Sequence, residues 1–348
     1  MRMVRLLCMS VSLFLPAMYN SLRMVQYNAE WLFVDHYKGG FDCPGTQCTW
    51  KNTTEAETHL DYFSRVVEYL APDILNVCEV EGINELQMVA DAVRNYSPEI
   101  DYIPYLVPGT DTATGQNVGL LSRIVPLVPL YRTEEKYEYP VAGSQCGYTG
   151  APSKTGVSKH YITELVLSTN DNLDIHVAMI SAHLIAIPTD PTRCAQREAQ
   201  ATILRHVVDG FLEKQIEVVV IGDMNDYDGA VLDLNSNIPI SRVLSILKGA
   251  NSTQPPLYSV ASKLLPMDRY SDWWDSDANC ATASQRDYSM IDHILVSENL
   301  LLYIENVFVY HGYPEFCGKY DSDHFPVVVD LGVGEPRKGT KVPFETLL

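Results

Sequence analysis

Two segments near the C-terminal end combine carboxylates with histidine. Ser-Asp-His-Phe-Pro-Val contains Asp323 and His324, and it follows Met-Ile-Asp-His-Ile-Leu-Val, which contains Asp292. Each polar cluster adjoins an apolar run, the pattern by which a buried strand presents side chains at its end. A histidine oriented by one carboxylate beside a second one suits metal-assisted hydrolysis, because the base takes a proton from water while acids hold a cation. The competing interpretation is a loop aspartate followed by a half-buried histidine.

Other apolar runs also end in polar or ionisable side chains. The residues concerned are Asn28, Glu79, His183, and the pair Asp223 and Asn225 in Gly-Asp-Met-Asn. Asp223 and Asn225 are two apart, so they point the same way if the extended conformation persists. Several strands that each end in such a group are typical of open α/β sheets, which bind ligands at the carboxyl ends of their strands.

The elements that must position these residues alternate along the chain. The spacing of apolar residues predicts helices over 55–70, 84–95, 193–212 and 241–248. It predicts strands over 24–33, 73–80, 102–107, 118–122, 159–167, 173–183 and 218–223, and two final strands that carry Asp292 and Asp323-His324. Such alternation predicts two packed sheets with helices outside.

In this order the polar residues resemble the signature of the endonuclease/exonuclease/phosphatase superfamily, the deoxyribonuclease I-like fold. The resemblance runs from about residue 24 to about residue 332. It implies a four-layer α/β sandwich, in which two packed mixed β-sheets are flanked by helices. No linker or repeat divides the chain, so we expect a single domain over 24–335 and a C-terminal tail over 336–348.

The resemblance also implies roles for these residues in phosphodiester hydrolysis. His324 would be the general base, oriented by Asp292, and His183 the general acid that protonates the leaving oxygen. Asp223 and Asn225 would orient the scissile phosphate and the water. The plainer alternatives are a strand-end carboxylate for Asp292 and a structural histidine for His183.

A divalent cation is part of the same expectation. The resemblance makes Glu79 the leading metal ligand, with Asn28 positioning the metal or Glu79, and Asp323 holding a second cation or polarising the site. Mg²⁺ suits such oxygen ligands, and Mn²⁺ or Ca²⁺ could replace it. The family's phosphate-gripping arginine has no obvious counterpart, and Lys159 is its candidate substitute, although a lysine lacks the arginine fork.

Composition limits the function in one respect. The 348 residues carry a formal net charge of -19, which argues against a broad basic surface that grips nucleic acid by counterion release. A nuclease remains compatible with this charge, because a catalytic cleft needs only a few cations and a metal. No stable protein partner is implied.

The N-terminus predicts export. Arg2 and Arg5 precede an uncharged stretch that Pro16 and Asn20 interrupt, so residues 1–23 read as a signal peptide rather than an integral membrane segment. The alternative is a translation start at Met24. Sequons at 52–54, 95–97 and 251–253 suit a secreted or endolysosomal protein.

The cysteines fit the same compartment. Cys78 lies inside a strand and is expected to be a buried free thiol. The other six downstream cysteines can form three bridges in several ways, and a short loop favours Cys43–Cys48. The resemblance implies two further bridges, Cys146–Cys194 and Cys280–Cys317.

Three other features invite interpretation. Trp273-Trp274 could stack on a base or a lipid headgroup, but a loop cluster that covers the core is favoured. Four aspartates, Asp268, Asp272, Asp275 and Asp277, could bind structural calcium or simply form a solvated acidic loop. His293 should face the opposite side of its strand from Asp292.

Together these features predict a secreted Mg²⁺-dependent phosphodiesterase, an endonuclease with DNA as its substrate. The alternative with the same fold is a sphingomyelinase-like phospholipid phosphodiesterase or another phosphoesterase, although no hydrophobic β-hairpin for membrane insertion is evident. A binding protein with an inactive site is a third hypothesis, which the full set of expected catalytic residues disfavours.

Overall fold

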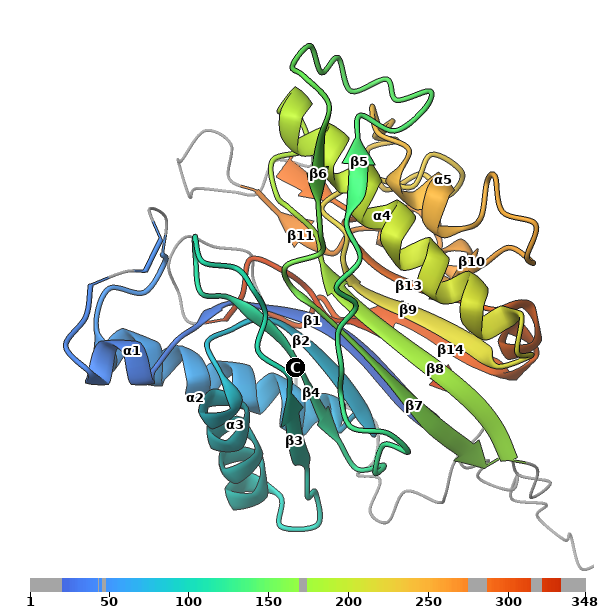
Figure 1. The fold of residues 1–348 in the computed structure, drawn as a ribbon. Helices are drawn as coiled ribbons and strands as arrows, with labels where there is room; N and C mark the ends of the chain where they lie inside the picture. The colour runs from blue at the N-terminus through green and yellow to red at the C-terminus, as the bar shows by residue number, and fades with distance from the viewer. Residues whose placement is uncertain are drawn as a thin grey trace, which may run out of the picture.

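Two β-sheets pack face to face, and helices cover the outer face of each (Figure 1). The computed structural model describes residues 21–42, 44–45, 48–168, 174–274, 287–313 and 321–332. The predicted four-layer α/β sandwich with two mixed sheets is confirmed.

The first sheet joins the two ends of the described chain. Its strand order is β14-β15-β1-β2-β4-β3, and β1 pairs antiparallel with β15 and parallel with β2. In chain order its strands are β1 (Leu22–Leu32), β2 (Ile74–Val80), β3 (Ile103–Leu106), β4 (Asn117–Ser122), β14 (Ile304–Val309) and β15 (Val327–Leu331).

The second sheet has the order β10-β13-β9-β8-β7, with β8 and β9 parallel and the other pairs antiparallel. Its strands are β7 (His160–Ser168), β8 (Asp174–His183), β9 (Glu217–Asp223), β10 (Tyr258–Ser259) and β13 (Asp292–Val296). Two short pairs stand apart from it: β5 (Tyr137–Tyr139) with β6 (Ser153–Thr155), and β11 (Asp272–Trp273) with β12 (Tyr288–Ser289).

Helices α2 and α3 cover the first sheet, and α4 and α5 cover the second (Figure 1). The α-helices are α1 (Asp35–Lys38), α2 (Thr53–Leu70), α3 (Ile83–Tyr96), α4 (Pro191–Leu212) and α5 (Val243–Leu247). Local sequence sets their starts. The Asn52 side chain accepts a hydrogen bond from Glu55 N before α2, and Asp190 does the same for Arg193 N before α4. Three 3₁₀ turns lie at Val260–Lys263, Pro266–Asp268 and Glu298–Tyr303.

Strand alternation separates the core into layers. In β1, Leu22 and Met24 pack between the two sheets, whereas Val25 and Tyr27 pack against α2 and α3. The period of two follows from the pleat of an extended strand. The same alternation in β2, β8, β9 and β13 places one side chain in two between the sheets. Polar residues on the strand faces that point between the two sheets therefore lie in one shared layer.

The structure contains elements that were not predicted from the sequence. They are the short helix α1 and the strands β5, β6, β10, β11, β12 and β14. Strand β14 was not expected, because residues 304–309 alternate weakly at an edge where Glu305 and Asn306 are exposed. The first strand also starts at Leu22 rather than Met24. Arg23 is anchored there, since its Nε donates to Asp330 Oδ1 at 2.7 Å.

Part of the predicted disulfide pattern lies within the described residues. The expected Cys146–Cys194 disulfide is present, and Cys78 is a buried free thiol as expected. Cys48 is disulfide-bonded, but Cys43, its predicted partner, lies outside the described residues, as does the Cys280–Cys317 pair. Within the described ranges, no helix has both the length and the apolar character needed to cross a bilayer.

Replacing the buried His160 of β7 by glutamine should make the fold less sensitive to acid. Burial, followed by the nearby Arg132, lowers the pKa of His160 to about 4, whereas an unfolded histidine titrates at about 6.5. Between pH 7 and 5, His160 therefore takes up a proton in the unfolded chain but not in the folded chain. This difference lowers the free energy of unfolding of the wild type by roughly 2 kcal/mol. Urea unfolding at both pH values should show this loss missing in His160→Gln, and equal losses in the two proteins would contradict the prediction.

Candidate active site

The predicted site residues meet at one end of the inter-sheet layer. Asp223 is the last residue of β9, and it faces His183 across the parallel pairing with β8 and Asp292 across the antiparallel pairing with β13. His324 precedes β15, which runs antiparallel to β1. The expectation that all these groups end their strands was wrong for Asp292 and His324. They lie at strand starts, because antiparallel neighbours bring a start beside an end.

Gly222 explains the Gly-Asp-Met-Asn sequence in physical terms. Its φ of +148° is unfavourable for other residues, and a Cβ there would lie 1.8 Å from Ala182 O. The glycine thus allows β8 and β9 to approach closely at the point where His183 and Asp223 emerge.

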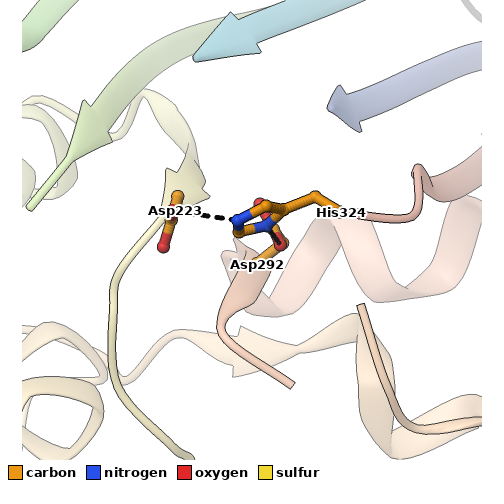
Figure 2. Close-up of side chains that lie close together, drawn as sticks. All are labelled: Asp223, Asp292 and His324. Atoms are coloured by element: carbon orange, nitrogen blue, oxygen red, sulfur yellow. Dashed lines mark hydrogen bonds and ion pairs between the residues drawn. The ribbon is translucent and has the colours of Figure 1, made fainter. Parts of the chain in front are cut away.

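Asp292 holds the imidazole of His324 (Figure 2). The Nδ1 atom of His324 lies 2.7 Å from Asp292 Oδ2, as predicted for an oriented base. Asp292 is fully buried and accepts two more hydrogen bonds, from Ser271 Oγ to Oδ2 and from Gln26 Nε2 to Oδ1, both at 2.9 Å. An ionised carboxylate only accepts, so Nδ1 carries the proton and Nε2 is the ring's second functional atom.

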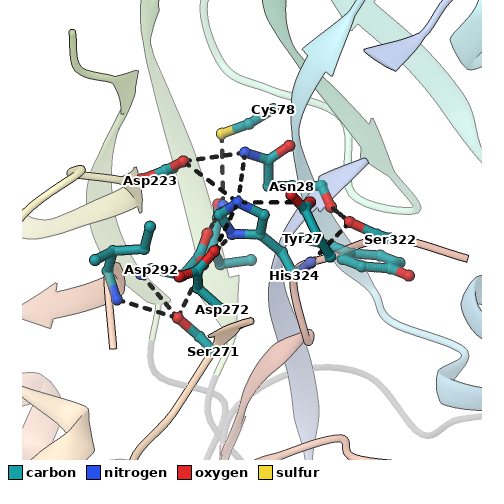
Figure 3. Close-up of polar contacts among 12 residues, drawn as sticks. Tyr27, Asn28, Cys78, Asp223, Ser271, Asp272, Asp292, Ser322 and His324 are labelled. Carbon is teal, nitrogen blue, oxygen red and sulfur yellow. Dashed lines mark hydrogen bonds and ion pairs between the residues drawn. The ribbon is translucent and has the colours of Figure 1, made fainter. Parts of the chain in front are cut away.

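The Nε2 atom of His324 faces carboxylates (Figure 3). It lies 3.6 Å from Asp272 Oδ1, 3.8 Å from Asp323 Oδ1 and 4.0 Å from Asp223 Oδ2, with Asn28 Nδ2 at 3.4 Å. This side of the ring is the one that can exchange a proton with a bound water.

Asn28 links the two sides of the site. Its Nδ2 donates to Asp223 Oδ2 at 3.0 Å and to Glu79 Oε1 at 3.3 Å. His183 Nε2 lies 3.6 Å from Asp223 Oδ2 and 3.9 Å from Glu79 Oε1. Glu79 itself has a φ of +62°, in the left-handed region, where the β1–β2 and β2–β4 registers shift. Such a backbone conformation at a charged residue is typical of functional sites.

The two predicted phosphate-contacting residues lie at the margin of this cluster. Lys159 is buried directly before β7, and its Nζ donates to Gln116 Oε1 at 3.1 Å. Asn225 does not continue the extended strand, because its φ is +50°. Its backbone N donates to Asp223 Oδ1 at 2.8 Å, while its Nδ2 donates to Leu184 O at 3.1 Å. The extended conformation therefore does not persist to Asn225, which was the condition for the predicted alignment of Asp223 and Asn225.

Two acids in the site were missed by sequence reasoning. Asp272, grouped above with calcium or loop aspartates, is buried and bridges to His324 through the backbone. Glu30 accepts a hydrogen bond from Asp323 N at 3.0 Å. Of the tandem tryptophans, Trp273 is in the core and Trp274 is 62% exposed. His293 faces away, as expected, with Nε2 2.9 Å from Asp226 O.

Burial dominates the electrostatics of the cluster. It raises the pKa of Asp223 to about 7, with Asp292 adding to the effect, the pKa of Asp272 to about 6, and that of Glu30 to about 7. Burial alone would lower the pKa of His324, but the surrounding carboxylates, Asp292 first, raise it well above its ordinary value.

Residues 26–324 match the model of the Endonuclease/Exonuclease/phosphatase family. The chain belongs to this family. No curated protein matches the sequence. Members of the family are in general phosphate-ester hydrolases that depend on a divalent metal, so this chain is a phosphoesterase-type enzyme.

Solved structures of the Endonuclease/Exonuclease/phosphatase fold superpose over most of the chain at low sequence identity. The catalytic domain of Xenopus laevis APE2 is 12% identical with a TM-score of 0.56, covering 92% of this chain and 94% of its own. An endonuclease/exonuclease/phosphatase from Bacteroides vulgatus is 16% identical with a TM-score of 0.51, covering 89% and 98%. Truncated Caenorhabditis elegans TDP2 is 13% identical with a TM-score of 0.50, covering 89% and 97%. At these identities the likeness shows the fold alone.

The donor set fits the divalent cation that the family uses. Oxygen ligands are those that Mg²⁺ prefers, and carboxylates whose pKa values rise on burial lack a sufficient countercharge of their own. Two groups offer ligand atoms within 4.8 Å of one another: Asp223 with Asp292 and His324, and Asp272 with Asp323 and His324. Within the described ranges Glu79 belongs to neither group. It is linked to Asp223 through Asn28, whose Nδ2 donates to both carboxylates.

Divalent cations should stabilise the folded protein in the absence of any substrate. At a free Mg²⁺ or Mn²⁺ concentration 100-fold above Kd, binding adds about 2.7 kcal/mol to the free energy of unfolding. Differential scanning calorimetry should show a rise in Tm that a chelator reverses and that Glu79→Gln reduces. The exposed Glu57→Gln serves as the matched control. An unchanged Tm, or the same rise in Glu79→Gln, would count against a metal held by Glu79.

Proposed function

We propose that this enzyme is an exported, Mg²⁺-dependent endonuclease that hydrolyses DNA phosphodiesters. The observation that carries the proposal is the 2.7 Å contact between Asp292 Oδ2 and His324 Nδ1, which leaves Nε2 directed at a carboxylate cluster. A base oriented by a buried acid, next to ligands for a cation, is the arrangement that metal-assisted hydrolysis requires.

His324 is the proposed general base. With Nδ1 committed to Asp292, the imidazole takes the proton of the attacking water at Nε2. Asp292 then stabilises the imidazolium that forms, as a buried carboxylate beside a histidine does in hydrolase triads.

His183 is the proposed proton donor to the leaving oxygen. It lies on the other side of Asp223 from His324, with Nε2 3.6 Å from Asp223 Oδ2. Burial, followed by Lys159 and His324, lowers the pKa of His183 well below its ordinary value. The ring is therefore neutral in the free site. An anionic phosphate bound beside it would raise this pKa, so that His183 takes up a proton in the complex and gives it to the leaving oxygen.

Asp223, Asn225 and Lys159 are proposed to hold the scissile phosphate and the water between the two histidines. Asp223 is fixed by Asn28 Nδ2 and by Asn225 N, so its position is set by two elements. A cation held by Glu79 and positioned by Asn28 would supply charge neutralisation at the phosphate. Asp323 would hold a second cation or polarise the site, and the positive charge of the cations would offset the carboxylate field on His324.

A histidine rather than a tyrosine at position 183 resembles the deoxyribonuclease I-like branch of the family, and this resemblance supports DNA as the substrate. The exposed Trp274, two residues after Asp272 in the chain, offers a face on which a base could stack. Export is supported by the Cys146–Cys194 disulfide, since disulfides persist in oxidising compartments.

The test is incubation of the purified protein with supercoiled plasmid and Mg²⁺, with parallel assays on sphingomyelin vesicles and on bis(p-nitrophenyl) phosphate. Nicking that a chelator and Glu79→Gln both abolish is the expected result. Hydrolysis of sphingomyelin without nicking would replace DNA by the lipid as substrate, and no hydrolysis of any of the three would overturn the proposal.

A further inference from the structure

Three polar side chains stand in the inter-sheet core where strand alternation calls for hydrophobes. Gln26 of β1, Asn76 of β2 and Tyr161 of β7 all have no exposed surface. Their neighbours on the same strand faces, such as Met24 and Ile74, are apolar. Burying polar groups lowers stability unless each finds a hydrogen-bond partner, so their partners matter.

The partners form one continuous path that ends at the site. Tyr161 OH donates to Asn76 Oδ1 at 2.8 Å, and Asn76 Nδ2 donates to Gln26 Oε1 at 2.5 Å. Gln26 Nε2 donates to Asp292 Oδ1 at 2.9 Å, and Asp292 Oδ2 contacts His324 Nδ1 at 2.7 Å. We call Tyr161, Asn76 and Gln26 the buried network. It crosses from the second sheet to the first and returns to the second at Asp292.

The charge of Asp292 determines which side chain donates and which accepts in every hydrogen bond of the buried network. An ionised carboxylate can only accept, so Gln26 must present its amide nitrogen to Asp292 and its oxygen to Asn76. Asn76 must then present its nitrogen to Gln26 and its oxygen to Tyr161. Gln26 and Asn76 are also register partners across β1 and β2. The amide orientations are thus set by the charge of Asp292.

We propose that the buried network consists of positioning residues that hold the Asp292 carboxylate in the orientation in which Oδ2 receives His324 Nδ1. The catalytic consequence rests on the function proposed above. Ser271 and His324 both contact Oδ2, whereas Oδ1 contacts Gln26. Gln26 therefore fixes rotation of the carboxylate about its Cβ–Cγ bond, and Asn76 and Tyr161 fix Gln26. A misplacement of about 1 Å in such a base can cost about 100-fold in rate.

The decisive variant is Gln26→Met, which keeps the approximate size of the side chain and removes the donor to Asp292. We expect kcat on plasmid DNA to fall by about 10- to 100-fold, the range for loss of an outer hydrogen-bond partner, with KM unchanged. Thr163→Val is the matched control. Thr163 is equally buried on β7, two residues from Tyr161, but its Oγ1 donates to Val128 O at 2.7 Å instead of joining the network.

A double-substitution cycle separates positioning from a general loss of structure. If Gln26 acts through Asp292, then Gln26→Met in an Asp292→Ala background should produce no further fall in kcat. A multiplicative fall in the double variant would mean that Gln26 acts otherwise. Should Gln26→Met fail to fold, Tyr161→Phe removes one hydroxyl at the far end of the network. It should lower kcat by a smaller factor, and an unchanged kcat would overturn the proposal.

A second readout does not depend on activity. The proton shared by His324 Nδ1 and Asp292 should give a low-field ¹H NMR resonance in the metal-free protein, assigned by its loss in His324→Ala. Gln26→Met should shift or broaden it, and Thr163→Val should leave it in place. An unchanged resonance in Gln26→Met would reject the buried network even if the wild type cleaves DNA. A shifted resonance in a protein without hydrolytic activity would support positioning and reject only the proposed function.

Discussion

His324→Ala should lower kcat for phosphodiester cleavage by about 10²- to 10⁴-fold, the usual contribution of one general base. The reason is that His324 Nε2 is positioned to take a proton from water, because Asp292 holds the Nδ1 atom of the same ring at 2.7 Å. Asp292→Ala should cost a similar factor, because the ring loses its orientation. The two residues act as a unit, so the double variant should be hardly worse than either single one.

Steady-state kinetics on plasmid DNA, with circular dichroism to verify folding, measures this effect. His206→Ala provides the control, since His206 lies on the outer helix α4 and pairs with Glu135 away from the site. A His324→Ala enzyme within tenfold of the wild type would remove His324 from the role of base.

Arg197→Met should lower the free energy of unfolding by roughly 3–5 kcal/mol, the usual consequence of leaving a buried charge unpaired. Arg197 of α4 has no exposed surface, and its Nε donates to Asp226 Oδ2 at 3.2 Å. Its two terminal nitrogens also bind backbone oxygens of the segment that follows His183, including Ile185 O at 3.0 Å. Methionine would remove the countercharge of Asp226, whose Oδ2 would keep the hydrogen bond from Ser241 Oγ, and it would leave these carbonyls without their guanidinium donor.

Chemical denaturation at neutral pH measures the loss. Arg65→Met is the matched control, because Arg65 pairs with Asp61 one turn away on the exposed face of α2, and such surface pairs contribute little. Equal losses in the two variants would show that burial of the Arg197 pair is not what stabilises the fold.

Much of the site could be predicted from the sequence for a physical reason. An ionisable residue at either end of a buried apolar strand is unfavourable unless it has a partner. Glu79, His183 and Asp223 at strand ends, and His324 before a strand, therefore each signalled a meeting point. Their order along the chain, which resembles that of the family, then indicated that they meet at one end of the strands.

Asp272 and Glu30 could not be found in the same way. Asp272 reaches His324 only because the two-residue strand β11 pairs with β12 and bridges to His324, a long-range pairing with no local signature. Glu30 lies at an irregularity of β1, where Glu30 and Trp31 both have positive φ. A period of two cannot anticipate such a bulge. The bend of Asn225 away from the strand was missed for the same reason.

The pairing of β1 with β15 has a consequence for how the protein is made. Leu22 lies opposite Leu331, so the first and last described strands are neighbours in one sheet, and His324 follows Asn28 by almost the whole chain. During synthesis the ribosome must release nearly every residue before the base can reach its partners. A polypeptide that ends before residue 324 therefore lacks the base, and on the function proposed above it should show no hydrolytic activity.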